Sequence, residues 1–236
     1  MNERGMIFND EMVRALLDGL KTQTRRIVNW RGLSEGLNLN FSGLKVCEYP
    51  KGWVIESDSR SSCEWRSQPT PCPYGADGDR IWVRETFSCI GNEDGHPVDT
   101  DGNLCSREDA QRIYRASAIK KSNNYGLWTS PDGFDFEGAW TPSIHMPRWA
   151  SRVLLEITTV RIERLNDISE KDAQAEGVTQ LQEGFWKHYQ PGWTQHQLSA
   201  RGSFATLWDS IYGEGAWDKN PWVWVVEFKR IGEEAL

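Results

Sequence analysis

The chain has 236 residues, 38% of them hydrophobic and 26% charged, a composition typical of a folded globular protein that excludes a disordered one. Its formal charge of −7 argues against broad, non-specific binding to nucleic acid or to an anionic membrane, because neutralising phosphates needs a positive surface. No apolar run reaches membrane-spanning length, and the first residues are polar, unlike a signal peptide. We therefore expect a cytoplasmic protein without membrane partners, folded as one elaborated domain over residues 1–236.

The cysteines and histidines show no metal-binding spacing. The five cysteines include no C-x2-C pair, and the four histidines form no H-x3-H or H-E-x2-H arrangement. We expect reduced thiols, no metal site and no cofactor. The cysteines are Cys47, Cys63, Cys72, Cys89 and Cys105.

An amphipathic helix is predicted near the N-terminus. Asn9 is a suitable cap, apolar residues follow at helical spacing, and Gly19 is suited to end the helix. The next residues, 22–28, favour an extended strand. The apolar stripe consists of Met12, Val13, Leu16 and Leu17.

Four polar side chains follow this helix at once: Lys21, Thr24, Arg25 and Arg26. At the rim of a pocket they would supply a base, a nucleophile and two forks that bind anions. The alternative is structural, because a lysine just past a helix end complements the helix dipole and a threonine suits a strand.

Residues 31–77 are rich in loops, with a predicted hairpin formed by 44–48 and 53–56. A strand is predicted over 78–87, in which Glu85 shares a face with Ile81 and Val83. Glu85 is thus a secondary candidate for a functional site. The alternative is a solvated strand end paired with Arg84 or Arg25.

Thirteen tryptophans stand out in the composition. Tryptophan fills cores and also stacks on nucleic-acid bases, and we expect packing for most of the thirteen. Trp30, Trp82 and Trp149 lie near the candidate segments, which makes them the candidates for stacking. Residues 89–146 form a second insertion rich in turns.

The most strongly β-patterned segment covers 152–165, and a short helix is predicted within 167–177. Ser169 caps this helix, Asp172 completes a capping box, and Gly177 ends the helix. Glu176 lies in the last turn, where its charge opposes the helix dipole. A local rule broken in this way indicates function, so Glu176 is a site candidate.

A second helix is predicted around 203–212, and a final strand over 222–228. The alternation of this strand predicts one buried face made of Trp222, Trp224, Val226 and Phe228.

Set in order, four elements carry a family resemblance. They are the Gly19-x-Lys21-x-x-Thr24-x-Arg26 motif, the Gly78-Asp79 turn with its strand, the 169–176 helix and the terminal Val-x-Phe strand. The chain resembles the ASCH family of the PUA-like superfamily, most of all the long versions carried by bacteriophages and prophages. The resemblance implies an α+β fold: a PUA-like small β-barrel with flanking helices, a core of about 1–30, 78–88 and 147–236, and two long loop-rich insertions, about 31–77 and 89–146.

The resemblance also implies an activity. The amidohydrolase branch of the family removes the acetyl group from N4-acetylcytidine with a lysine, a threonine and a glutamate, which match Lys21, Thr24 and Glu176. Thr24 would attack the amide carbonyl and Lys21, when neutral, would take its proton, although pairing with Glu176 would favour the charged lysine. We select as substrate-binding residues Arg25, Arg26, Trp82, Glu85 and Trp149.

Two further functions stay open. One is a non-catalytic module that binds RNA or a modified base by aromatic stacking beside the two arginines. The other is a metal-independent ribonuclease of the same fold, for which the sequence offers no convincing histidine pair. The expected partner is therefore a modified nucleoside or single-stranded RNA.

Overall fold

The computed structural model describes the chain except for residues 35–36, 38, 42, 58–65, 122–125 and 232–236. Its contacts divide the chain into two compact units. The first unit comprises Met1–Gly19, Arg80–Glu156 and Arg230–Leu236, and the second comprises Leu20–Asp79 and Ile157–Lys229. Each unit is thus assembled from segments far apart in the sequence. That the whole chain is one domain stays a prediction.

Parallel and antiparallel pairing are combined in the first unit. Strand β1 (Glu3–Ile7) pairs in parallel with β5 (Arg80–Arg84), which pairs antiparallel with the first residues of β11 (Leu154–Arg164). Helix α1 (Asp10–Leu17) begins at the predicted cap, because the Asn9 side chain accepts a hydrogen bond from the Met12 amide at 2.8 Å. Gly19 has a φ of 72°, the left-handed conformation that favours glycine after a helix.

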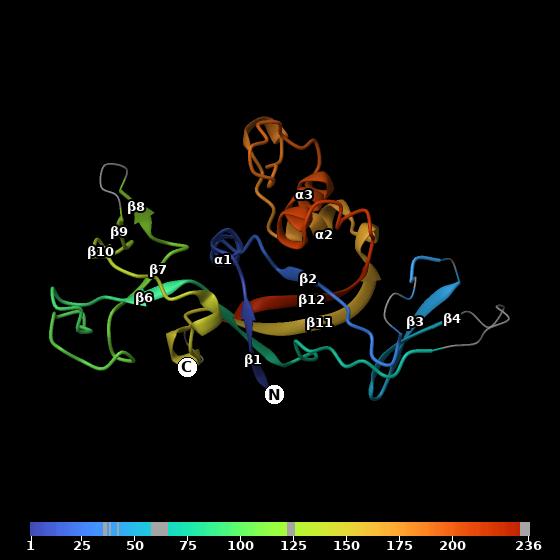
Figure 1. Cartoon of the computed structure of the whole chain (residues 1–236), viewed down its shortest axis with the longest axis horizontal. Coiled ribbons are helices and arrows are strands. Elements are labelled where there is room, and N and C mark those ends of the chain that lie inside the picture. The colour runs from blue at the N-terminus through green and yellow to red at the C-terminus, as the bar shows by residue number, and fades with distance from the viewer. Residues whose placement is uncertain (35–36, 38, 42, 58–65, 122–125, 232–236) are drawn as a thin grey trace. The chain divides into compact units, whose positions relative to one another are not determined.

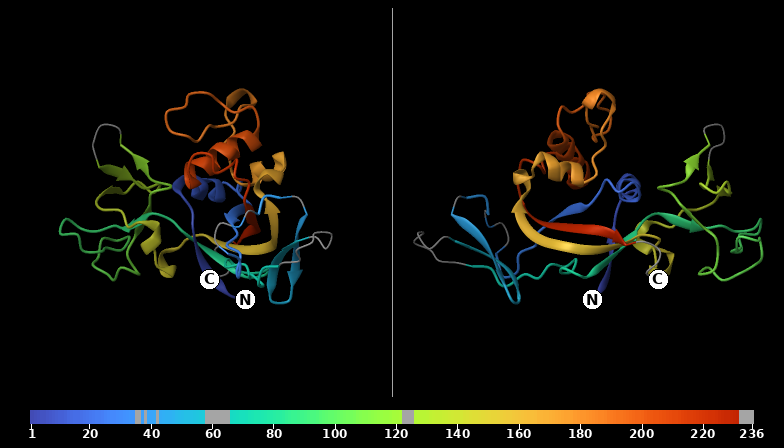
Figure 2. Two further views of the ribbon diagram at one scale, coloured as in Figure 1. Left: turned by 45° about the vertical axis from the view of Figure 1, so that its right-hand side comes forward. Right: turned by 180° about the vertical axis from the view of Figure 1, so that it is seen from behind.

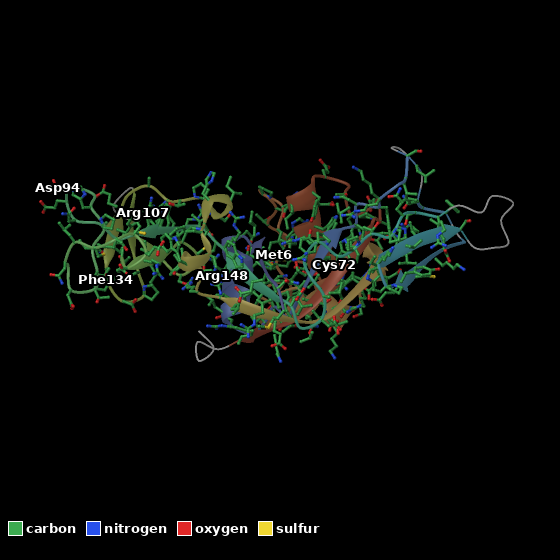
Figure 3. The ribbon with its side chains drawn as sticks, turned by 90° about the horizontal axis from the view of Figure 1, so that it is seen from below. Met6, Cys72, Asp94, Arg107, Phe134 and Arg148 are labelled. Carbon is green, nitrogen blue, oxygen red and sulfur yellow. The ribbon has the colours of Figure 1, made fainter. Side chains whose placement is uncertain are left out.

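The region 87–150 has short strands and a small core of its own. Its buried residues Ile90, Val98, Ile113 and Phe136 pack together. Figure 3 shows the side chains of Asp94, Arg107 and Phe134 on this part of the chain. The short elements of the region are β6 (Phe87–Cys89), β7 (Arg112–Tyr114), β8 (Ile119–Lys120), β9 (Leu127–Thr129), β10 (Asp135–Glu137), η1 (Ser143–His145) and η2 (Arg148–Ala150).

The second unit carries the remainder of β11, followed in the sheet by β12 (Trp222–Ile231) and β2 (Gln23–Ile27). Strands β3 (Leu44–Tyr49) and β4 (Gly52–Ser57) form the predicted antiparallel hairpin. Helices α2 (Glu170–Ala175) and α3 (Ala200–Tyr212) lie together on one face of the strands β11, β12 and β2 (Figures 1 and 2). Two short 3-10 helices, η3 (Leu165–Asp167) and η4 (Gln182–Gly184), complete the unit.

The α+β class is confirmed: strands predominate and helices are few. The strand order β1-β5-β11-β12-β2 is linear, so no closed barrel forms in the described part of the chain. Strand β12 corrects a second expectation. Val223 and Val225, on the face opposite the predicted one, are fully buried. On the predicted face Trp224, Val226 and Phe228 are buried, whereas Trp222 is only partly buried. A strand buried on both sides loses the simple alternation on which a one-sided prediction depends.

Helix α3 has 13 residues, fewer than the roughly 20 apolar residues needed to cross a bilayer. Among the described residues, no helix combines the length and the apolarity of a membrane span.

Candidate functional site

The short helix α2 places Glu176 at its C-terminal end. The predicted capping box is present: the Ser169 hydroxyl accepts a hydrogen bond from the Asp172 amide at 3.0 Å and donates to Asp172 Oδ2 at 2.7 Å. Glu176 is the residue that caps the other end, and Gly177 follows with a φ of 83°. Glu176 is 3% exposed, so its carboxylate is turned into the protein.

Lys21 reaches the same helix end from the N-terminal segment. Its Nζ donates to Glu176 Oε2 at 2.8 Å and to the Glu176 backbone oxygen at 2.7 Å. The Thr22 amide donates to the Ala175 carbonyl at 2.8 Å and so ties the adjoining backbone to the helix. Two residues separated by 155 positions are thereby brought into a buried ion pair.

Arg25 lies in the same cluster, with a side chain that is 0% exposed. Its Nη1 donates to Gln23 Oε1 at 2.7 Å and to Glu176 Oε1 at 3.2 Å, and its Nη2 donates to Glu163 Oε2 at 3.2 Å. Each oxygen of the Glu176 carboxylate therefore has its own cation. The contacts of Arg25 are with protein groups, and its predicted role in substrate binding stays a prediction.

An outer layer of charge surrounds this cluster. Gln23 Nε2 donates to Asp172 Oδ1 at 2.9 Å, and Arg161 forms ion pairs with Glu163 and Glu227. Burial alone would raise the pKa of Asp172, but hydrogen bonds from Gln23 and Ser169 and the charges of two nearby arginines together outweigh it and hold that pKa below its usual value.

The sequence pattern does not identify this outer layer, although it contains one signal of it. Gln23 and Arg25 are two apart on a strand, so their side chains share a face. Glu163 and Arg161 are related in the same way on β11. The residue pattern within a single strand does not predict that this face of β2 contacts this face of β11.

Thr24 and Arg26 alternate with Gln23 and Arg25 along β2, so they belong to its opposite face. Thr24 is 2% exposed and is paired with Val226 of β12. Its hydroxyl makes no hydrogen bond with any residue that the structure describes.

Arg26 lies close enough to Tyr74 to affect its titration. Burial raises the pKa of the Tyr74 phenol, and the Arg26 guanidinium opposes this shift.

The electrostatics of Lys21 favour a neutral amine more than an exposed position would. Burial lowers the pKa of Lys21 below its ordinary value of 10.5, and the contact with Glu176 opposes this. Arg26 and Arg25 add to the lowering through charge repulsion. Burial and the two arginines together outweigh the effect of the Glu176 carboxylate, so the net direction of the pKa shift of Lys21 favours the neutral base.

The other three predicted substrate contacts belong to the first unit. Trp82 carries the Arg84 guanidinium over its ring at 5.4 Å, and Trp149 packs edge-on against Phe87 with ring centroids 6.1 Å apart. Their roles in substrate binding stay predictions, as does that of Glu85.

The alternative reading of Glu85 needs a correction. Glu85 is 0% exposed, so it is no solvated strand end, and its partner is Arg152 instead of Arg84 or Arg25. Arg152 donates through Nε and Nη2 to the two carboxylate oxygens, both at 2.9 Å, and also to the Ser117 hydroxyl at 2.8 Å. This two-point geometry is the strongest form of an arginine–carboxylate pair.

A small aromatic pocket of about 230 Å³ lies elsewhere in the second unit, lined by Trp30, Trp222, Arg164 and Lys219 among others. The Arg164 guanidinium lies over the Trp222 ring at 4.9 Å and donates to Asn40 Oδ1 at 2.8 Å. Trp30, a predicted stacking candidate, is thus part of a pocket. From the strand pattern, Trp222 was expected only to pack in the buried face of its strand.

In the described part of the chain no three histidine, cysteine, aspartate or glutamate residues are grouped so as to hold a metal ion. Cys47, Cys72, Cys89 and Cys105 are free thiols, and Cys63 lies outside the described residues.

Comparison of the chain with models of known families, with curated proteins and with solved structures found no match. The function is therefore argued from the geometry of the site and from the motif that carries the resemblance.

Proposed function

We propose that the second unit is an amidohydrolase that removes the acyl group from N4-acetylcytidine or a related N4-acylated cytosine nucleoside. The observation that carries the proposal is the buried pair of Lys21 and Glu176, in which burial lowers the pKa of the lysine. Surface lysines are charged at neutral pH, whereas a base for catalysis needs a pKa closer to the working pH. The resemblance of the motif to the ASCH family supports this choice, and we propose a PUA-like origin for the α+β fold with it.

Each catalytic residue has one role in the proposed reaction. The Thr24 oxygen attacks the amide carbonyl carbon while its proton passes to neutral Lys21. The tetrahedral intermediate collapses, Lys21 returns the proton to the leaving cytosine amine, and the acyl group remains on Thr24 as an ester. Water then hydrolyses the ester, with Lys21 as base, and a carboxylic acid leaves.

Two further groups support these steps. Glu176 orients the Lys21 amine by accepting its hydrogen bond at 2.8 Å. Arg26 is our candidate for binding the oxyanion, because a guanidinium fork matches an oxygen that gains negative charge. Thr24 and Arg26 share one face of β2, so the nucleophile and the oxyanion site can serve the same carbonyl group. Gln23 and Arg25 belong to the other face, so the proposed proton transfer requires the amine of Lys21, which precedes the strand, to reach Thr24.

The test is hydrolysis of N4-acetylcytidine, followed by release of acetate and cytidine. Lys21→Met, Thr24→Val and Glu176→Gln should each lower kcat by a factor of about 100 or more, in keeping with the size of general-base effects. Lys171→Met is the matched control, because this lysine is exposed on α2. Absence of acetate from the wild-type protein would reject the activity on this substrate.

The aromatic pocket favours a second candidate, a non-catalytic module that binds a modified base or single-stranded RNA. Indole rings beside an arginine offer stacking and charge to a base with its phosphate. The volume of about 230 Å³ lies below the roughly 300 to 1,000 Å³ of pockets for drug-sized ligands and suits one base. The pocket and the Lys21 cluster are separate sites. Val28, which lines the pocket, is seven residues from Lys21, or about 23 Å along an extended strand.

Two variants separate these functions. Under the enzyme proposal, Lys21→Ala abolishes hydrolysis and Trp222→Ala leaves kcat unchanged. Under the binding proposal, Trp222→Ala weakens binding of a fluorescent cytidine-rich RNA at least tenfold, Lys21→Ala weakens it less, and no variant releases acetate.

A further inference from the structure

We propose that Arg25 is a positioning residue, which holds one oxygen of Glu176 so that only the other oxygen faces Lys21. This inference rests on the proposed function and replaces substrate binding as the role of Arg25. It also identifies Gln23 as the residue that orients the guanidinium.

Burial is the first reason. The Arg25 side chain is 0% exposed, and both of its terminal nitrogens already donate to protein acceptors. The guanidinium is instead surrounded by protein acceptors from three elements. These acceptors are Gln23 on β2, Glu163 on β11 and Glu176 at the end of α2.

The second reason is that the two oxygens of the Glu176 carboxylate have different partners. Oε2 lies 2.8 Å from Lys21 Nζ, and Oε1 lies 3.2 Å from Arg25 Nη1. A carboxylate shared with a permanent cation gives less negative charge to its second partner, because arginine stays protonated. Arg25 thereby weakens the hold of Glu176 on the Lys21 proton and leaves the hydrogen bond that orients the amine.

Stability alone is a poor explanation for this arrangement. Buried ion pairs are often no more stabilising than apolar side chains of similar size. Arg25 Nε is also buried without a hydrogen-bond partner among the described residues. A buried donor without a partner is costly, so the guanidinium is not placed for the largest number of bonds.

The charged groups around the pair come from four elements. Arg25 and Arg26 repel its proton, and Glu176 attracts it. A further set acts on Arg25 and on its partners: Glu163 and Arg161 of β11, Asp172 of α2 and Glu227 of β12.

The test is direct titration of Lys21 by carbon-13 NMR of labelled lysine side chains in the full-length chain. The Lys21 signal is assigned by its absence in Lys21→Met. In Arg25→Gln the pKa of Lys21 should rise by about one unit or more, because a neighbouring cation is removed and Glu176 is released to it. Arg25→Lys keeps the charge and should raise the pKa of Lys21 less. Arg31→Gln changes an exposed arginine of the same segment and should leave the pKa of Lys21 unchanged.

Gln23→Met is the second variant, for use if Arg25→Gln does not fold. It removes one hydrogen bond of the guanidinium, of 2.7 Å, and leaves every charge in place. The pKa of Lys21 should rise by less than in Arg25→Gln and in the same direction. An unchanged pKa of Lys21 in the folded variants would overturn the proposal.

Kinetics give an independent readout. The pH at which kcat/KM reaches half of its maximum should move upward in Arg25→Gln by the same amount as the pKa of Lys21 in the free protein, while KM changes less than twofold. A substrate-binding arginine would instead raise KM at every pH. If the wild-type protein hydrolyses no acylated cytidine, the proposed function fails, while the NMR titration still tests the link between Arg25 and Lys21.

Discussion

The ammonium group of Lys21 contacts Glu176 at two points, 2.8 Å from carboxylate Oε2 and 2.7 Å from the backbone oxygen. That carbonyl lies at the C-terminal end of α2, where the helix dipole is negative. One residue thus offers a side-chain charge and a helix end to the same cation. Loss of either partner leaves a buried charge without compensation.

Replacing the acid should therefore be costly. Glu176→Gln is expected to lower the free energy of unfolding by roughly 3–5 kcal/mol, the range for breaking a buried ion pair, because both Lys21 and Arg25 lose a partner. Urea unfolding followed by tryptophan fluorescence measures the change. Glu183→Gln, at an exposed glutamate of the same unit, is the control and should cost less than about 0.5 kcal/mol. Equal effects in the two variants would contradict a stabilising role for the pair.

Raising the pH should stabilise the fold through Lys21. Because burial lowers its pKa in the folded protein below the ordinary value of 10.5, the unfolded chain binds more protons between the two pKa values. The contribution of Lys21 to the free energy of unfolding is thus lowest below the folded pKa and rises with pH through this window.

The measurement is urea unfolding of wild type and Lys21→Met from neutral pH to about pH 10. The unfolding free energy of the wild type, relative to that of the variant, should increase with pH. A difference that stays constant, or falls, would show that the folded protein does not lower the pKa of this lysine.

The cap of α2 should matter for stability and for the site at once. Ser169→Ala removes the hydroxyl that accepts from the Asp172 amide, and we expect a loss of about 1 kcal/mol. Since α2 ends at Glu176, hydrolysis should fall as well, by less than in Glu176→Gln. Ser169→Thr keeps a hydroxyl acceptor and should retain most of the stability, whereas equal losses in both variants would argue against the cap.

Glu85 and Arg152 should behave as a structural pair in the first unit. The single variants Glu85→Leu and Arg152→Leu are each expected to destabilise by roughly 3–5 kcal/mol, because each leaves a charge without its partner. The double variant should cost clearly less than the sum of the two. Additive losses would mean that the two side chains do not stabilise one another, and would favour the predicted role of Glu85 as a substrate contact.

Local signals in the sequence predicted the ends of the helices well. Asn9, Ser169 and Gly177 act within three residues of the groups they satisfy, so the sequence carries the whole interaction. The hairpin of β3 and β4 was predicted for the same reason. Glu176 was selected as a site candidate because its charge breaks a rule of its own helix, and its functional role stays a prediction.

Local signals of this kind do not predict contacts between residues that are distant in the sequence. Nothing near Arg25 indicates that Glu163 and Glu176 contact it, and nothing near Glu85 indicates Arg152. The second buried face of β12 was missed because alternation describes a strand with one side in solvent. The packing of sheets and helices against one another decides these contacts.

The distance in sequence between β2 and its partners has a consequence for synthesis on the ribosome. Strand β2 leaves the ribosome early, whereas β12, to which it is hydrogen-bonded, and α2, which supplies Glu176, are translated much later. Until then the nascent chain holds Lys21 and Arg25 in water without the acids that accompany them in the finished fold. Translation must therefore reach α2 and β12 before these two cations can leave solvent.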